Sequence, residues 1–136
     1  MRFDTKIAVL LRDDLATWQR LNVTAFLVSG VLGAEPELLG EPYFDADGTR
    51  YHAMFRQPVL IFSGDVETLA AAHQRALSRD IRMSVFTEEL FSTGNDLDNR
   101  AAVRAVGRDK LNLVGIALHA PKNAVDKILK GATLHR

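Results

Sequence analysis

The sequence predicts an α/β fold: three layers, with a mixed, mostly parallel sheet of about four strands flanked by helices. Short apolar runs typical of buried strands alternate with longer segments whose apolar residues recur at helical spacing. The chain has 136 residues, enough for one domain with a sizeable core, so residues 1–136 are expected to form a single domain. The composition, 47% apolar and 25% charged, is ordinary for a soluble globular protein.

The first expected elements are a strand and a long helix. KIAVLLR, residues 6–12, is a nearly continuous apolar run, which is typical of a strand buried on both faces. Asp13 or Asp14 is placed to cap a helix that runs to about residue 32, with Gly33 as its stop. That helix is apolar on most sides, which indicates either a central position or a subunit interface.

The rest of the chain is expected to alternate strands and helices. A loop rich in Pro and Gly comes first, and YFDADGTRY within it is expected to form a hairpin that turns at Asp47-Gly48. Pro121 is placed in the first turn of the last helix, and Gly131 is placed to end it. The elements expected after the hairpin are a strand at 57–64, a helix at 66–79, a strand at 81–86, a short helix at about 97–106, a strand at 111–119 and a helix at about 122–130.

The composition excludes several kinds of site. The chain has no cysteine, so disulfides, thiolate metal sites and a cysteine nucleophile are excluded. Its four histidines are well separated and the glycine-rich phosphate loops are absent, so neither a metal nor a cofactor is predicted. No segment approaches the roughly 18 apolar residues of a membrane span. The start of the chain does not read as a signal peptide, so we expect a cytoplasmic protein that does not bind membranes.

Charge is distributed unevenly along the chain. Residues 1–99 carry 9 basic and 15 acidic side chains, a net −6, whereas residues 100–136 carry 8 basic and 2 acidic ones, a net +6. The two segments either neutralise each other in the fold or mark a site for an anionic partner. Arg100, Arg104 and Arg108 recur every four residues, which indicates an anion-binding stripe or a solvated helix face where Asp96 pairs with Arg100.

Taken in order, these segments resemble the type-two peptidyl-tRNA hydrolase family. LLRDDL, residues 10–15, matches the family's strand that ends in Arg-x-Asp-Leu. VLIFSGDVETLAAAHQRALSRDIRMSVF resembles its next strand, acidic helix start and following strand, and LVGIALHAPKNAVDKILKGATL resembles its closing segment. The resemblance covers most of the chain as a pattern. It implies a peptidyl-tRNA-hydrolase-II-like fold.

The catalytic positions of that family differ in this chain. The family's cationic lysine falls on Asn22, which carries no charge, and its helical glutamine falls on Phe26. Glu88 lies near the place of an aspartate, and Asn112 lies near the place of a threonine. The chain is therefore similar to a bacterial family of unknown function, the domain-of-unknown-function 2000 group, which shares the fold but lacks the catalytic set. Active peptidyl-tRNA hydrolysis is not expected.

The candidate site lies where the first strand ends and its helix begins. Glu88 and Asn112 are the candidate catalytic residues, with Glu88 exchanging a proton. The candidate ligand-binding residues are Arg12, Asp14, Asn22 and Thr87. The alternative is that Arg12 and Asp14 form only a local ion pair and a helix cap.

Three functional classes remain open. The first is an enzyme that hydrolyses an ester or amide with a changed catalytic set. The second is a binding module for a small anionic ligand or an RNA end, recognised by Arg12 and the arginines of 100–108. The third is an interaction protein without a small-molecule site. The apolar first helix predicts a homodimer in each case.

Overall fold

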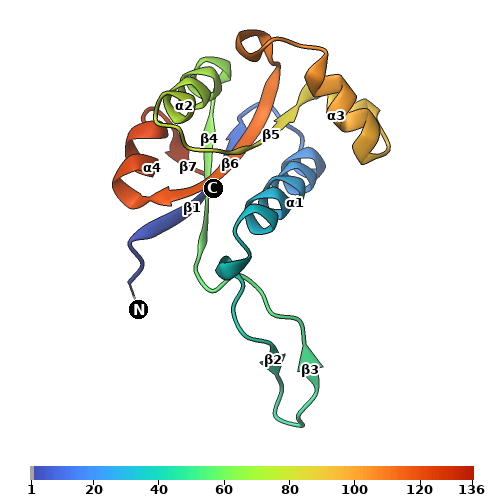
Figure 1. The fold of residues 1–136 in the computed structure, drawn as a ribbon, viewed down its shortest axis with the longest axis vertical. Coiled ribbons are helices and arrows are strands. Elements are labelled where there is room, and N and C mark those ends of the chain that lie inside the picture. The colour runs from blue at the N-terminus through green and yellow to red at the C-terminus, as the bar shows by residue number, and fades with distance from the viewer. Residues whose placement is uncertain (1) are drawn as a thin grey trace.

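A five-stranded sheet forms the centre of the computed structural model, which describes residues 2–136 (Figure 1). Its strands are β1 (Thr5–Arg12), β4 (Val59–Gly64), β5 (Ser84–Thr87), β6 (Leu113–Pro121) and β7 (Thr133–Leu134). They lie in the order β5-β6-β1-β4-β7. β1 is central, which explains its apolar run: every side chain from Ile7 to Leu11 is at most 2% exposed.

The sheet is mixed, as predicted, but its strand pairs are not mostly parallel. β1 pairs in parallel with β4, whereas β1 with β6, β5 with β6, and β4 with β7 are antiparallel pairs. β1, β4 and β5 therefore run in one direction, and β6 and β7 run in the other. Because β6 lies between β1 and β5, only one neighbouring pair is parallel. The short β7 raises the number of strands above the expected four.

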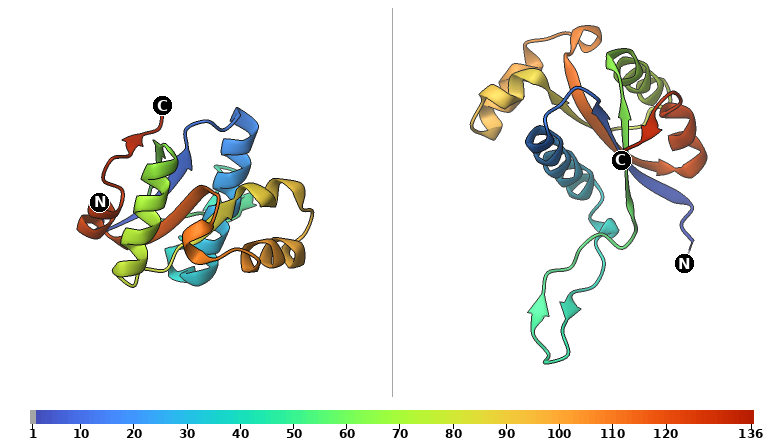
Figure 2. Two further views of the ribbon diagram at one scale, coloured as in Figure 1. Left: turned by 90° about the horizontal axis from the view of Figure 1, so that it is seen from above. Right: turned by 180° about the vertical axis from the view of Figure 1, so that it is seen from behind.

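Helices cover both faces of the sheet (Figure 2). The helix α1 (Thr17–Ala34) packs on one face, and α2 (Val66–Ser78) and α4 (Lys122–Ile128) pack on the other. Side chains of a strand point alternately to its two faces, so β1 contributes to both cores. Ile7, Val9 and Leu11 face α1, whereas Ala8 and Leu10 face α2 and α4.

The helix α3 and three short 3₁₀ helices complete the fold. α3 (Asp96–Arg104) lies beyond β5, at the edge of the sheet (Figure 1). The 3₁₀ helices are η1 (Pro36–Leu38), η2 (Glu88–Ser92) and η3 (Arg108–Lys110). The predicted helix at 97–106 is confirmed with slightly different bounds.

The predicted cap of the first helix is wrong. α1 begins after Ala16, whose backbone N–H donates to the Gln19 side chain at 2.9 Å, so neither Asp13 nor Asp14 is the cap. The Asp14 carboxylate is instead engaged by an arginine of β1, described below. Gly33 does not end the helix either, because α1 continues one residue further.

The predicted hairpin is confirmed and projects from the body of the protein. It consists of β2 (Tyr43–Phe44) and β3 (Arg50–Tyr51), with Gly48 at a φ of 82° in the turn, a conformation that glycine adopts without strain. Residues 39–56, which we call the arm, carry this hairpin away from the sheet and the helices (Figures 1 and 2), whereas Phe55 at the base of the arm packs against the core on the α1 face.

Candidate functional site

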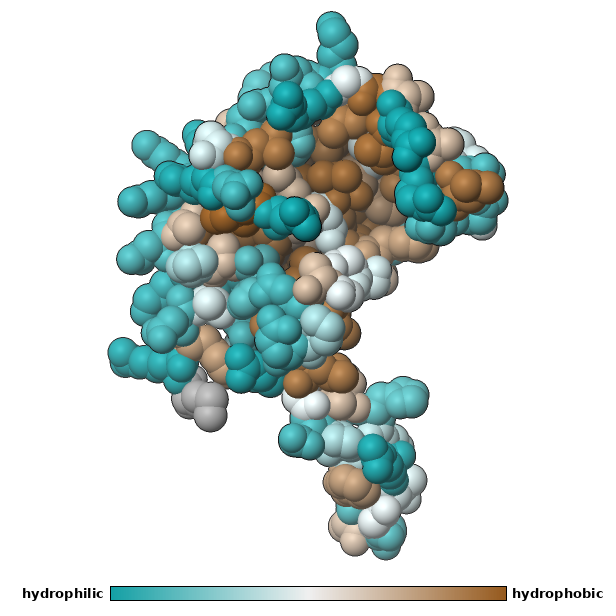
Figure 3. All heavy atoms as spheres, viewed as in Figure 1, coloured by the Kyte–Doolittle hydropathy of each residue, from teal (hydrophilic) through white to brown (hydrophobic). Residues whose placement is uncertain are grey.

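A groove of about 620 Å³ lies between α1, β5 and α3. Apolar side chains form most of its lining: Phe26 and Leu27 come from α1, Val85 and Phe86 from β5, and Val103 from α3. Figure 3 shows apolar side chains gathered in a hollow over β5, between α1 and α3. An apolar groove with a few polar groups is the usual form of a small-molecule site.

Aromatic side chains form one end of this groove and line an adjoining hollow of about 360 Å³. The rings of Phe26 and Phe86 meet edge to face at 5.9 Å between centroids, and those of Trp18 and Phe91 do so at 5.7 Å. Phe86 and Phe91 are 5.1 Å apart. Phe26 and Trp18 are still 53% and 61% exposed, so their ring surfaces remain available to a ligand.

The basic side chains of the groove come from α3. Arg100 donates to Asp96 at 2.8 Å, which confirms the helical ion pair considered from the sequence. Arg104 also lines the groove and forms no ion pair with any residue of 2–136. Arg108 lies in η3, because α3 ends at Arg104. The three arginines therefore do not share one helix. Because Arg100 is already paired with Asp96, Arg104 is the groove arginine that can bind an acidic group of a ligand.

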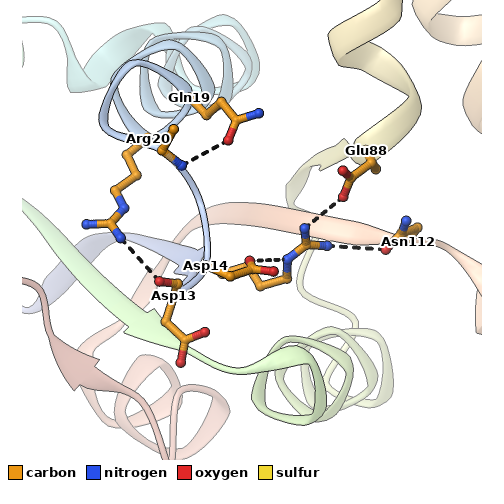
Figure 4. A network of polar contacts seen from close by, with 8 residues as sticks. Asp13, Asp14, Gln19, Arg20, Glu88 and Asn112 are labelled. Atoms are coloured by element: carbon orange, nitrogen blue, oxygen red, sulfur yellow. Dashed lines mark hydrogen bonds and ion pairs between the residues drawn. The ribbon is translucent and has the colours of Figure 1, made fainter.

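A second polar cluster surrounds Arg12, at the end of β1. Its guanidinium donates to Asp14, to Glu88 at 2.7 Å and to the Asn112 side-chain oxygen at 3.3 Å. Figure 4 shows Asp14, Glu88 and Asn112 pointing toward one guanidinium from three separate segments. The Arg12 side chain is only 11% exposed. Burial acts to lower its pKa, but the bonds to Asp14 and Glu88 outweigh burial and the pKa is raised.

Four of the six predicted site residues therefore lie together, and a fifth lies beside them. Thr87 immediately precedes Glu88, whose backbone N–H donates to the Asn112 carbonyl at 3.0 Å. The Thr87 hydroxyl is buried and has no hydrogen-bond partner among the described residues. Asn22 is not part of this cluster but lines the aromatic hollow.

The charge of the Arg12 cluster disfavours an anion. Two carboxylates, Asp14 and Glu88, already engage the single guanidinium, so the three charges sum to −1. Arg12 therefore joins β1 to the segment after β5. This arrangement corresponds to the alternative considered from the sequence, in which Arg12 and Asp14 form an ion pair. The aromatic groove, which sequence reasoning did not identify, is better placed to hold a ligand. Its only sequence signal was the excess of apolar residues on α1.

His119 forms a third polar cluster, near the other end of the sheet. Its Nδ1 lies 2.6 Å from a Glu35 carboxylate oxygen, and its Nε2 lies 2.8 Å from the Thr5 hydroxyl. Gln57 donates to the same hydroxyl at 3.2 Å. These bonds connect the C-terminal end of α1 to β1 and β6.

Two features are absent from residues 2–136. No three His, Asp or Glu side chains in that part of the chain are grouped so that they could hold a metal ion. None of the helices within the same residues has the length and apolar content that crossing a bilayer requires.

The fold and the groove define a class: a mixed α/β protein with helices on both faces of one sheet and an apolar groove at the sheet edge. The chain belongs to the family described as protein of unknown function (DUF2000), whose model matches residues 5–136. It is 50% identical to Atu0240, a protein of unknown function from Agrobacterium tumefaciens, with a TM-score of 0.97. That match covers 99% of this chain and 100% of the other. No curated protein matches the chain significantly.

Proposed function

We propose that the protein binds a small ligand with an apolar, ring-containing body and one acidic group, in the groove between α1, β5 and α3. The observation that carries the proposal is the combination of an apolar lining with a cation, Arg104, that forms no ion pair within residues 2–136. The exposed ring of Phe26, which meets the buried Phe86 edge to face, suits a planar body, and a guanidinium suits a carboxylate or phosphate. An RNA end is disfavoured, because a single arginine supplies little of the charge that phosphate backbones require.

A fluorescent probe tests this directly. Anilinonaphthalene sulfonate has an aromatic body and one anionic group, and phenylnaphthylamine has a closely related body without the charge. We expect the wild type to bind the sulfonate more tightly than the neutral probe. Arg104→Gln should raise the Kd of the sulfonate about tenfold, which corresponds to about 1.4 kcal/mol, and leave the Kd of the neutral probe unchanged.

Two further variants complete the experiment. Arg108→Gln removes a nearby positive charge that does not line the groove, so it should change neither Kd. Phe26→Ala removes an aromatic wall and should weaken both probes. Equal loss of sulfonate binding in the Arg104 and Arg108 variants would show general charge attraction and contradict the proposal.

Ester or amide hydrolysis at the Arg12 cluster is the second candidate function. The buried Thr87 hydroxyl next to Glu88 supports it, because it has no hydrogen-bond partner within residues 2–136 and such a group often binds a water molecule or a substrate. Glu88 would act as general base and Asn112 would hold a polar substrate group. Hydrolysis of peptidyl-tRNA or of a nitrophenyl ester that is abolished by Glu88→Gln would support this role, and turnover unchanged in that variant would exclude it.

We likewise propose that the fold is related to that of the type-two peptidyl-tRNA hydrolases. It is supported by LLRDDL, which places Arg12 at the end of β1 and Asp14 just beyond it. Asn22 offers no cation in the adjoining hollow, so peptidyl-tRNA cleavage is expected to be absent.

We also propose that the protein forms a homodimer through α1. Trp18 and Phe26 line the hollow and the groove, but Leu21 lines neither and is 69% exposed, which is unusual for a helix in contact only with water. No charged residue lies between Leu21 and Ala34. A surface without charge can pack against its own copy without like-charge repulsion.

A further inference from the structure

Thr5, His119 and Glu35 form a chain of hydrogen bonds that we call the Thr5 triad. The Nε2 atom of His119 lies 2.8 Å from the Thr5 hydroxyl, and its Nδ1 atom lies 2.6 Å from a carboxylate oxygen of Glu35. A hydroxyl, an imidazole and a carboxylate in this order match a nucleophile, its base and the group that orients the base. Because this arrangement recurs on unrelated folds, its geometry and not its sequence position identifies it.

Strand register brings two members of the triad to one face of the sheet. His119 of β6 pairs with Ile7 of β1, and Thr5 lies two residues before Ile7, so the three side chains point to the same face. That face is the one that α1 covers. Glu35 directly follows the last residue of α1. The triad therefore joins three segments that the fold packs together.

Gln57 determines where the Thr5 hydroxyl proton points. Its side-chain Nε2 donates to the Thr5 backbone carbonyl at 3.2 Å, which only the NH₂ end of an amide can do, and to the Thr5 hydroxyl oxygen at 3.2 Å. Since that oxygen accepts from Gln57, its own proton is free to be donated to His119 Nε2. Neutral His119 then carries its proton on Nδ1 and donates it to Glu35. In this tautomer an imidazole can take a proton from a hydroxyl.

Small molecules can reach the triad. Thr5 is partly exposed, and the side chains of His119 and Glu35 are 13% and 37% exposed. A hollow of about 300 Å³ lies against His119 and Glu35, and part of its lining is apolar, from Val31, Ala34 and Leu118. The Gln57 side-chain oxygen is buried and has no hydrogen-bond partner within residues 2–136, and such an acceptor commonly binds a water molecule or a ligand.

We propose that the Thr5 triad is an acyl-transfer site for esters of short apolar acids, separate from the groove and from the Arg12 cluster. The Thr5 oxygen attacks the ester carbonyl carbon while its proton passes to His119 Nε2, and Glu35 stabilises the charged imidazole. The bond from that carbon to the alcohol oxygen then breaks, and His119 returns the proton to this oxygen. Water attacks the acyl carbonyl next and gives a proton to His119, which passes it to the departing Thr5 oxygen.

A fluorophosphonate probe locates the nucleophile, because an activated hydroxyl displaces its fluoride and keeps the phosphonyl group. Peptide mapping by mass spectrometry should find the adduct on Thr5 of the wild type and none on Thr49, an exposed threonine of the arm. An adduct at this position also separates the triad from hydrolysis at the Arg12 cluster, which needs no bond to Thr5. A wild type with no more adduct on Thr5 than on Thr49 would overturn the proposal.

Variants of the nucleophile and the base test the chemistry. Thr5→Ser should keep both the adduct and turnover of p-nitrophenyl acetate at the triad, whereas Thr5→Val should lose both. His119→Gln should slow adduct formation about a hundredfold or more, because the base is removed. His52→Gln, on the exposed arm, is the matched control and should react at the wild-type rate. An adduct that forms on Thr5 at the wild-type rate in His119→Gln would overturn the proposal.

Glu35 is a positioning residue, because it contacts His119 and not the substrate. Glu35→Gln keeps the size of the side chain but removes the charge, so adduct formation should slow about tenfold or more. Glu35→Asp keeps the charge and should recover part of the rate. A merely structural role would be filled better by Gln than by Asp, so the reverse order of rates would contradict the triad. Circular dichroism checks that each variant is folded.

Discussion

The guanidinium of Arg12 contacts the carboxylate of Glu88 at 2.7 Å, and this bond joins β1 to the segment after β5 across the intervening strand β6. The two residues are 76 positions apart in sequence. Asn112, immediately before β6, accepts from the same guanidinium. One largely buried arginine therefore holds three segments together at this end of the sheet.

Replacement of Arg12 by methionine should destabilise the protein. The change leaves the carboxylates of Asp14 and Glu88 facing each other without a cation, and we expect a loss of about 1–3 kcal/mol in the free energy of unfolding. Arg12→Lys should recover only part of this, because an ammonium cannot make the same planar set of bonds. Urea unfolding measures the free energy of unfolding of both variants.

The control for this prediction is Arg100→Gln. Arg100 also pairs with an aspartate, but its side chain is 65% exposed, so solvent screening should keep its effect below about 0.5 kcal/mol. Equal losses for Arg12→Met and Arg100→Gln would contradict a special role for the Arg12 cluster.

Gly115→Ala should disturb the packing of α1 on the sheet. A Cβ at Gly115 would lie 2.8 Å from a Val23 methyl carbon and 2.9 Å from a Leu27 methyl carbon, both in the buried core. Overpacking of this kind costs about 1–3 kcal/mol, which urea unfolding can measure. Gly107→Ala is the control: a Cβ there meets nothing within 4 Å, and the φ of −65° suits alanine. If Gly115→Ala leaves the free energy of unfolding unchanged, α1 can move outward without cost and the prediction is wrong.

The buried His73 should make stability depend on pH. Burial lowers its pKa below 6.5, with Asp109 opposing the shift and Arg108 adding to it. The unfolded chain therefore binds this proton more readily, so the stabilisation is present above about pH 6.5 and is lost as the pH falls through the folded pKa.

His73→Gln tests this dependence. The variant should lose less stability than the wild type when the pH is lowered from about 7.5 to about 5, as measured by urea unfolding. His52→Gln, on the exposed arm, should follow the wild type. Parallel curves for the wild type and His73→Gln would contradict the role of His73.

Asp65 should stabilise α2 as its N-cap. Its carboxylate accepts from the Thr68 hydroxyl at 2.7 Å and from the Thr68 backbone N–H at 2.8 Å, and these bonds lower its pKa below 3.8. The stabilisation is thus present above about pH 3.8 and is lost as the pH falls through the lower, folded pKa.

Asp65→Ala should lower the Tm, and Asp65→Asn should lower it less, because an amide oxygen still accepts these bonds. Glu67→Ala, in the same helical turn but outside the cap, is the control and should have a smaller effect. A Tm for Asp65→Ala equal to that of Glu67→Ala would exclude the capping role. Scanning calorimetry near neutral pH measures all three.

Local patterns predicted most of the elements. The apolar run at 6–12 corresponds to β1, and the Asp47-Gly48 turn corresponds to the hairpin, because each depends on neighbouring residues. The cap of α1 was wrong for the opposite reason. The Asp14 carboxylate could cap a helix, but it accepts from Arg12 instead. Arg12 is held in place because it also donates to Glu88 and Asn112.

Sequence alone determined the alternation of strands and helices, the apolar character of α1, and the polar residues at the strand ends, since these follow from the order of side chains along the chain. Tertiary structure decided which of them meet. It brought Glu88 and Asn112 to Arg12, moved Asn22 to an aromatic hollow, and formed a groove from α1, β5 and α3. Contacts between residues tens of positions apart depend on strand order, and strand order is set by how the whole core packs.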